Sequence, residues 1–173
     1  MKAGMIAAAV VALLIGGGAA PAPLAPLDFL IGEWTGGGSG APGASAGGTT
    51  FARELQGRVV VRTNFADYPA SGERAAFRHD DLMVVYADAD GRLKADYFDS
   101  EGHVIRYLAQ PRDGGGVVFV GEPSPGAPRF RLAYAPGADG VVVGTFEIAP
   151  PDKPEAFKTY LSWTMRRAAP AKK

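Results

Sequence analysis

Few side chains of this chain can carry out acid–base or metal chemistry, because it has two histidines and no cysteine. His103 follows a turn that carries Asp99 and Glu101, and this turn stands between Tyr97 and Tyr107. The two carboxylates can polarise the imidazole so that it acts as a base. We therefore take His103 as the best single candidate for proton transfer or ligation.

Other catalytic and metal-binding patterns in the sequence are weak. His79 stands directly before Asp80 and Asp81, but successive side chains of an extended chain point apart, so these three residues match metal geometry poorly. Ser45 stands in a Gly-x-Ser-x-Gly match at 43–47, but it falls in a loop-like glycine-rich segment without a histidine neighbour, so it does not predict a nucleophile. The glycine run at 36–40 is followed by neither Lys-Ser/Thr nor a helix pattern, so it does not predict a phosphate-binding loop. We predict no metal site and no catalytic residue beyond the candidate His103.

A larger set of polar and aromatic side chains lies in segments that are otherwise rich in Val, Phe and Tyr. A charge that faces inward there must be paired or must face a wet cavity, because an unpaired buried charge is costly. The pattern favours exterior placement for most of the charged members, and the sequence leaves both placements open. The residues that can anchor a ligand in an aromatic-lined pocket are Arg62, Tyr86, Tyr97, His103, Arg106, Tyr107, Tyr134 and Glu147.

The elements that must position these side chains are short strands. Turn signals recur at roughly 8–12-residue spacing, and several are Asp-Gly pairs, which supply the positive φ of tight hairpins. Together with the strand that holds Trp34, the expected strands are 49–55, 59–65, 81–87, 93–98, 103–110, 117–121, 129–135, 141–149 and 156–167. We predict an all-β fold, a single closed antiparallel up-and-down barrel of about ten strands. The glycine-rich segment 36–48 indicates a strand end followed by a mobile loop near one barrel mouth.

The two ends of this strand pattern resemble the calycin superfamily, which covers lipocalins, fatty-acid-binding proteins and nitrobindin-like haem barrels. The resemblance rests on a Gly-x-Trp at Trp34 in the first strand and a Trp-x-Met-x-Arg that ends at Arg167 in the last. It implies that Trp34 packs across the closed end of the barrel and that Arg167 lies over its indole, with Arg166 as the alternate if the register slips. The strand number and the glycine-rich loop look closer to nitrobindin-like and uncharacterised bacterial lipocalin-like domains than to eight-stranded lipocalins.

The resemblance raises the question of whether this barrel binds haem. Nitrobindin-like barrels bind haem through a histidine near the C-terminus, and this chain has no histidine after His103. We therefore predict no cofactor. A haem barrel with another ligand, such as His79, His103 or a tyrosine, remains an alternative.

The first residues predict export. Residues 1–20 combine a positive start, an apolar run and small residues, which is typical of a signal peptide. The run is short for a bilayer span, which takes about 20 apolar residues, and an uncleaved anchor is the alternative. We expect a Pro/Ala linker at 21–26, the barrel at 27–167 and a flexible tail at 168–173. The expected location is periplasmic or secreted, with no stable membrane insertion after signal removal.

The charge balance narrows the class of partner. Lys plus Arg and Asp plus Glu each number 18, so no net field attracts nucleic acid or anionic lipid. The leading hypothesis is an exported barrel that binds a small apolar or amphipathic ligand without transforming it. The alternatives are an enzyme that uses His103 or an inward carboxylate such as Glu147 or Asp96, the haem barrel, and an envelope interaction module with a solid core. The oligomeric state stays open.

Overall fold

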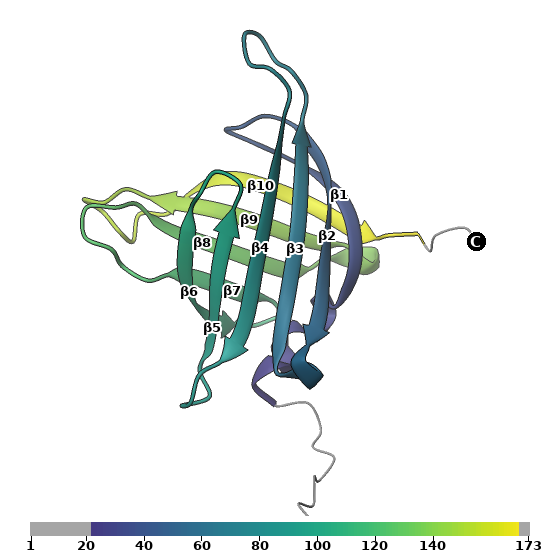
Figure 1. Cartoon of the computed structure of the whole chain (residues 1–173), viewed down its shortest axis with the longest axis vertical. Coiled ribbons are helices and arrows are strands. Elements are labelled where there is room, and N and C mark those ends of the chain that lie inside the picture. Colours follow the sequence, from purple (N-terminus) through teal and green to yellow (C-terminus); the bar gives the residue numbers. More distant parts are fainter. Residues whose placement is uncertain (1–21, 170–173) are drawn as a thin grey trace, which may run out of the picture.

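Ten strands build the structure over residues 22–169, the part of the chain that the computed structural model describes. Each strand pairs antiparallel with its neighbours in sequence, and β1 pairs with β10, so the barrel is closed (Figure 1). The strands are β1 (Gly32–Gly40), β2 (Ser45–Glu54), β3 (Val59–Tyr68), β4 (Phe77–Ala87), β5 (Leu93–Asp99), β6 (Val104–Pro111), β7 (Val117–Gly121), β8 (Arg129–Pro136), β9 (Val142–Ala149) and β10 (Lys158–Arg167). The predicted all-β, up-and-down antiparallel barrel is confirmed.

The hairpin connections follow from the turn residues of the sequence. Gly91 ends the β4–β5 turn at φ +77° and Gly102 lies in the β5–β6 turn at φ +89°. Residues with a side chain rarely adopt this left-handed backbone conformation. Glycine adopts it readily, so it lets the chain reverse direction within a few residues. Short reversals of this kind place consecutive strands side by side, which gives the up-and-down order.

A 3-10 helix, η1 (Ala22–Leu30), closes one end of the barrel. Three residues make one turn of such a helix, so the leucines spaced by three share one face. Leu24, Leu27 and Leu30 are all buried and belong to the barrel core. Residues 22–26, which the sequence indicates as part of a linker, are thus part of this helix. Two shorter 3-10 turns, η2 (Leu55–Gly57) and η3 (Ala138–Gly140), lie between strands.

The glycine-rich segment is strand rather than loop. β1 runs to Gly40 and β2 begins at Ser45, so the predicted mobile loop over 36–48 is wrong. The reason is the close approach of neighbouring backbones. A Cβ at Gly36 would collide with the carbonyl oxygen of Thr164 in β10, and one at Gly47 would collide with that of Phe65 in β3. Glycine is therefore required at these positions by contacts with strands that are distant in sequence. Pairing with those strands stabilises an extended segment whose own composition is typical of a loop.

The end covered by η1 is the floor of the barrel. There the indole Nε1 of Trp34 donates to the carbonyl of Leu30 at 2.7 Å. The guanidinium of Arg167 lies 4.2 Å from the Trp34 ring centroid and also donates to the carbonyl of Ile31. The first and last strands are thereby fastened to each other and to η1.

Two terminal segments lie outside the described residues. They are the predicted export signal with its following residue, 1–21, and the last part of the predicted tail, 170–173. Among residues 22–169, no helix is both long enough and apolar enough to cross a membrane.

Candidate functional site

A cavity of about 500 Å³ extends from Trp34, at the floor, to the opposite end of the barrel. It reaches Pro42 in the β1–β2 turn, the ends of the long β3–β4 hairpin at Tyr68 and Phe77, and the β5–β6 turn. We call this end the mouth. The β3–β4 hairpin extends beyond the rest of the barrel here (Figure 1). A ligand would therefore enter at the end away from η1.

The wall of the cavity is mainly apolar and aromatic. On β8, β9 and β10 the larger lining side chains are Phe130, Leu132, Phe146, Ile148, Tyr160, Leu161 and Trp163. Five lining residues on β1 and β2 are glycines, which contribute no side chain to fill the interior. Protein interiors are otherwise packed with few voids larger than a water molecule. The glycines of β1 and β2 thus help to keep the mouth half hollow.

A buried ion pair lies on the opposite wall, on β3 and β4. Arg62 Nη2 is 3.2 Å from Asp81 Oδ2, and the two side chains are 6% and 2% exposed. Asn64 donates to the same Asp81 oxygen at 2.8 Å. Arg62 Nε and Asp81 Oδ1 have no hydrogen-bond partner among residues 22–169. The pair therefore offers a donor and an acceptor beside an apolar cavity.

The charge states around this pair follow from burial and from the neighbouring groups. Burial lowers the pKa of Arg62, but Asp81 and nearby tyrosines outweigh it, so the pKa is raised and the side chain is a fixed cation. Burial raises the pKa of Tyr97 and of Tyr107 strongly, and that of Tyr134 to about 12. These tyrosines are neutral hydroxyl groups that can donate or accept.

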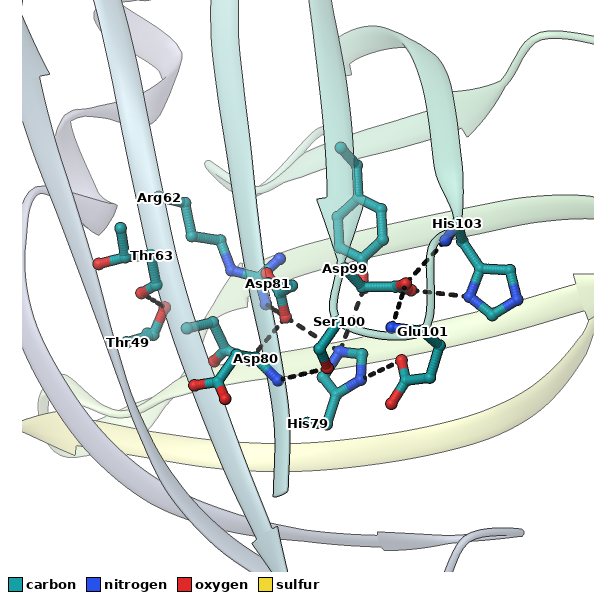
Figure 2. A network of polar contacts seen from close by, with 12 residues as sticks. Thr49, Arg62, Thr63, His79, Asp80, Asp81, Asp99, Ser100, Glu101 and His103 are labelled. Atoms are coloured by element: carbon teal, nitrogen blue, oxygen red, sulfur yellow. Dashed lines mark hydrogen bonds and ion pairs between the residues drawn. The ribbon is translucent and has the colours of Figure 1, made fainter. Parts of the chain in front are cut away.

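Two histidines continue the polar wall toward the mouth. His79 Nδ1 lies 2.7 Å from Glu101 Oε2, and its Nε2 lies 3.2 Å from Tyr97 Oη and 3.3 Å from Asp81 Oδ2. Hydrogen bonding to Asp81 raises the pKa of His79 against the opposing effect of burial. Figure 2 shows how His79 on β4 faces the β5–β6 turn that carries Glu101 and His103.

Asp99 connects the second histidine to this wall. Its Oδ2 lies 2.9 Å from His103 Nδ1 and accepts from Tyr97 Oη at 3.4 Å. Its Oδ1 accepts from the backbone N–H groups of Glu101 and His103. Burial acts to raise the pKa of Asp99, but these hydrogen bonds outweigh it, so the pKa is lowered and the carboxylate is ionised.

The structure brings half of the predicted ligand-binding residues to the cavity. Arg62, Tyr97, His103 and Tyr107 line it. Tyr134 is buried below, with its ring centroid 5.9 Å from Arg62 Cζ, and supports the arginine rather than lining the space.

The other predicted residues lie away from the cavity. Tyr86 donates to Asp96 at 3.2 Å, and Tyr86 and Arg106 border a separate polar depression. Glu147 accepts from Arg131 at 2.6 Å, and its two neighbours in β9 line the cavity, so period-2 alternation turns Glu147 outward. Both carboxylates considered for an enzyme, Glu147 and Asp96, are therefore outside the barrel, whereas His103 is at the mouth.

A strand that begins at residue 81 leaves His79 in the turn before it, so the sequence predicts no pocket role for His79 or Asp81 and offers His79 only as an alternative haem ligand. β4 in fact begins at Phe77, so His79 and Asp81 lie two residues apart and share the inward face with Met83. Asp80 points outward and pairs with Arg78. The signal available in the sequence is the alternation that runs back from Met83 through both residues.

These features define a class, a closed ten-stranded antiparallel barrel with a hollow, aromatic-lined mouth half and a charged wall. The architecture is compatible with a calycin-like fold. No protein-family model matches the chain, and no curated protein matches its sequence.

Proposed function

We propose that this protein binds a small amphipathic molecule in the barrel cavity without transforming it. The observation that carries the proposal is a cavity of about 500 Å³ that combines an aromatic wall with the buried Arg62–Asp81 pair. Small-molecule sites typically have volumes of about 300–1,000 Å³, an apolar lining and a few placed polar groups. The cavity has each of these properties.

The polar wall specifies the kind of ligand group. A buried donor or acceptor without a partner costs about 1–3 kcal/mol. Arg62 Nε and Asp81 Oδ1 are such a donor and acceptor among the described residues. Both atoms are buried, so a ligand hydroxyl or carboxamide meets the pair where Arg62 and Asp81 line the cavity, accepting from the guanidinium or donating to the carboxylate. We therefore expect an apolar or aromatic body against Phe146 and Trp163, with one such neutral group toward Arg62.

We propose further that the barrel is calycin-like and that the protein is exported. The support for a calycin-like barrel is the contact of Arg167 with the Trp34 ring at the closed end. The support for export is the apolar run at residues 5–15 of the sequence. Expression of the full chain in a bacterial host, followed by fractionation and N-terminal sequencing, tests the export.

Binding is tested with 1-anilinonaphthalene-8-sulfonate, an amphipathic dye whose fluorescence rises in apolar sites. Ile148 in β9 lines the cavity, so Ile148→Trp should fill part of it and weaken dye binding at least tenfold. Val143 lies on the same strand, is 38% exposed and does not line the cavity. Val143→Trp is the matched control and should bind the dye like the wild type.

Two results would overturn the proposal. One is the absence of saturable dye binding by the wild-type protein, with native mass spectrometry of the purified protein showing no bound small molecule. The other is equal dye affinity in the wild type, Ile148→Trp and Val143→Trp, because that would locate the dye outside the cavity.

A further inference from the structure

A second site lies where β4 meets the β5–β6 turn. We propose that His79, Asp99 and Glu101 bind a divalent transition-metal ion of the Zn²⁺ type. One potential ligand atom from each residue lies within 4.8 Å of the others. Imidazole nitrogen and carboxylate oxygen together suit Zn²⁺ and its first-row neighbours. This site goes beyond the proposed binding of a small molecule and does not depend on it.

The charges on this wall favour a divalent cation. Asp81 and Glu101 lie against His79, Asp99 lies against His103, and Arg62 is the permanent cation that contacts Asp81. Metal ligation requires a neutral imidazole. With both imidazoles neutral, three carboxylates against one guanidinium leave two negative charges. One divalent ion neutralises them.

Asp81 provides an independent indication. A metal-bound histidine usually donates its other ring N–H to a carboxylate, which fixes the tautomer and the ring orientation. The Asp81 side chain is 2% exposed and its Oδ2 lies 3.3 Å from His79 Nε2. Arg62 and Asn64 hold this carboxylate in place. Its Oδ1 has no partner among residues 22–169. Asp81 is therefore positioned to orient His79 so that Nδ1 binds the ion.

The two carboxylate ligands differ in freedom. The Asp99 side chain is 5% exposed and is fixed by the turn, whereas Glu101 is largely exposed. Ligand atoms about 2.0–2.1 Å from a tetrahedral zinc ion are about 3.3 Å apart. The present separation of His79 Nδ1 and Glu101 Oε2 is 2.7 Å. A rotation of the exposed Glu101 side chain can widen this separation by about half an ångström. The Asp99 ligand atom, now within 4.8 Å of the other two, has to lie at a similar spacing from them when the ion binds.

The test uses the full-length chain without a histidine tag, titrated with Zn²⁺ by calorimetry and with Co²⁺ by visible absorption. We expect one ion per chain and the d–d bands of low-symmetry Co²⁺. His79→Gln should weaken Zn²⁺ binding at least 100-fold. Asp81→Asn should weaken it 10–100-fold, as expected for a residue that orients a ligand. Asp80→Asn is the matched control, because the Asp80 side chain points outward and pairs with Arg78, and its loss should be under fivefold.

Circular dichroism identifies variants that fail to fold. If Asp81→Asn does not fold, Glu101→Gln replaces it, since an exposed side chain is tolerant of change, and should weaken Zn²⁺ binding at least tenfold. Failure of the wild-type chain to bind Zn²⁺ below 100 µM would overturn the proposal. Equal losses in His79→Gln and Asp80→Asn would also overturn it, because they would indicate nonspecific binding to surface side chains.

Discussion

The floor and mouth halves of the barrel interior are made by the same strands but filled in opposite ways. At the floor, Phe119 is fully buried and meets Tyr107 and Tyr134 edge to face, with ring centroids 6.2 and 6.5 Å away. At the mouth, the same ring of strands surrounds a cavity and carries the buried Arg62–Asp81 pair. Both halves contain buried polar atoms without partners among the described residues, but the floor is packed with aromatic and aliphatic side chains, whereas the mouth is hollow and charged.

This difference separates stability from binding. Burial of apolar side chains is the main favourable term in folding, and the floor supplies it together with the leucines of η1. The hollow interior and the Arg62–Asp81 pair beside it contribute little to the stability of the fold or reduce it. Departures of this kind are expected at functional sites, where other regions compensate for them.

The test with the largest expected effect on stability replaces one phenylalanine in each half of the barrel by alanine. Phe119→Ala should lower the free energy of unfolding by about 3–5 kcal/mol, because it opens a new void in a packed core. Phe146 is partly buried and borders a space that already exists. Phe146→Ala should cost less than about 2 kcal/mol, since mainly the transfer of the ring is lost. Guanidinium unfolding followed by circular dichroism measures both, and equal costs would break the comparison.

The second test concerns the buried ion pair. Arg62→Met leaves Asp81 without its cation and should destabilise the fold by about 3–5 kcal/mol. The double variant Arg62→Met, Asp81→Leu removes both charges and should recover most of this loss, because a buried pair is often no more stabilising than apolar residues of similar volume. The same unfolding measurement applies. A double variant as unstable as the single one would show that the pair itself stabilises the barrel.

The sequence predicted the barrel well because its signals are local. Glycine turns such as Gly91 and Gly102 fix where the chain reverses, and alternation within β8 indicates which side chains face inward. The resemblance also predicted that Trp34 and Arg167 lie together, and the two side chains are in contact in the structure. Features of this kind depend on a few neighbouring residues or on a recurrent motif.

The mouth was predicted less well because its signals are not local. The strand assignment of Gly36 and Gly47 depends on backbones more than 15 residues away in sequence. The inward placement of His79 depends on where β4 begins. The polar residues at the start of β4 are of types that are also common in turns, so the sequence alone does not show that the strand begins at Phe77. A cavity reflects the summed volume of side chains from many strands, which no single segment reports.

The third test sharpens the description of the floor. Arg167→Gln removes the cation over Trp34 and the donor to the Ile31 carbonyl, and should destabilise the barrel by about 1 kcal/mol. Arg166 is its neighbour, is exposed and makes neither contact, so Arg166→Gln is the matched control and should be neutral within about 0.5 kcal/mol. Thermal unfolding compares them. Equal effects of the two variants would mean that the cation–π contact contributes nothing to closure.

The smallest expected effect lies on the outer surface, where neither half of the interior is involved. Glu147 and Arg131 form an ion pair that is partly exposed to solvent, and such pairs contribute about 0.2–1 kcal/mol. Glu147→Gln should therefore change stability by less than about 1 kcal/mol and leave dye binding unchanged. A double-mutant cycle with Arg131→Gln isolates the pair. If Glu147→Gln instead weakened dye binding tenfold, β9 would present its other face to the cavity, and the boundary between the hollow mouth and the outer surface would have to be redrawn.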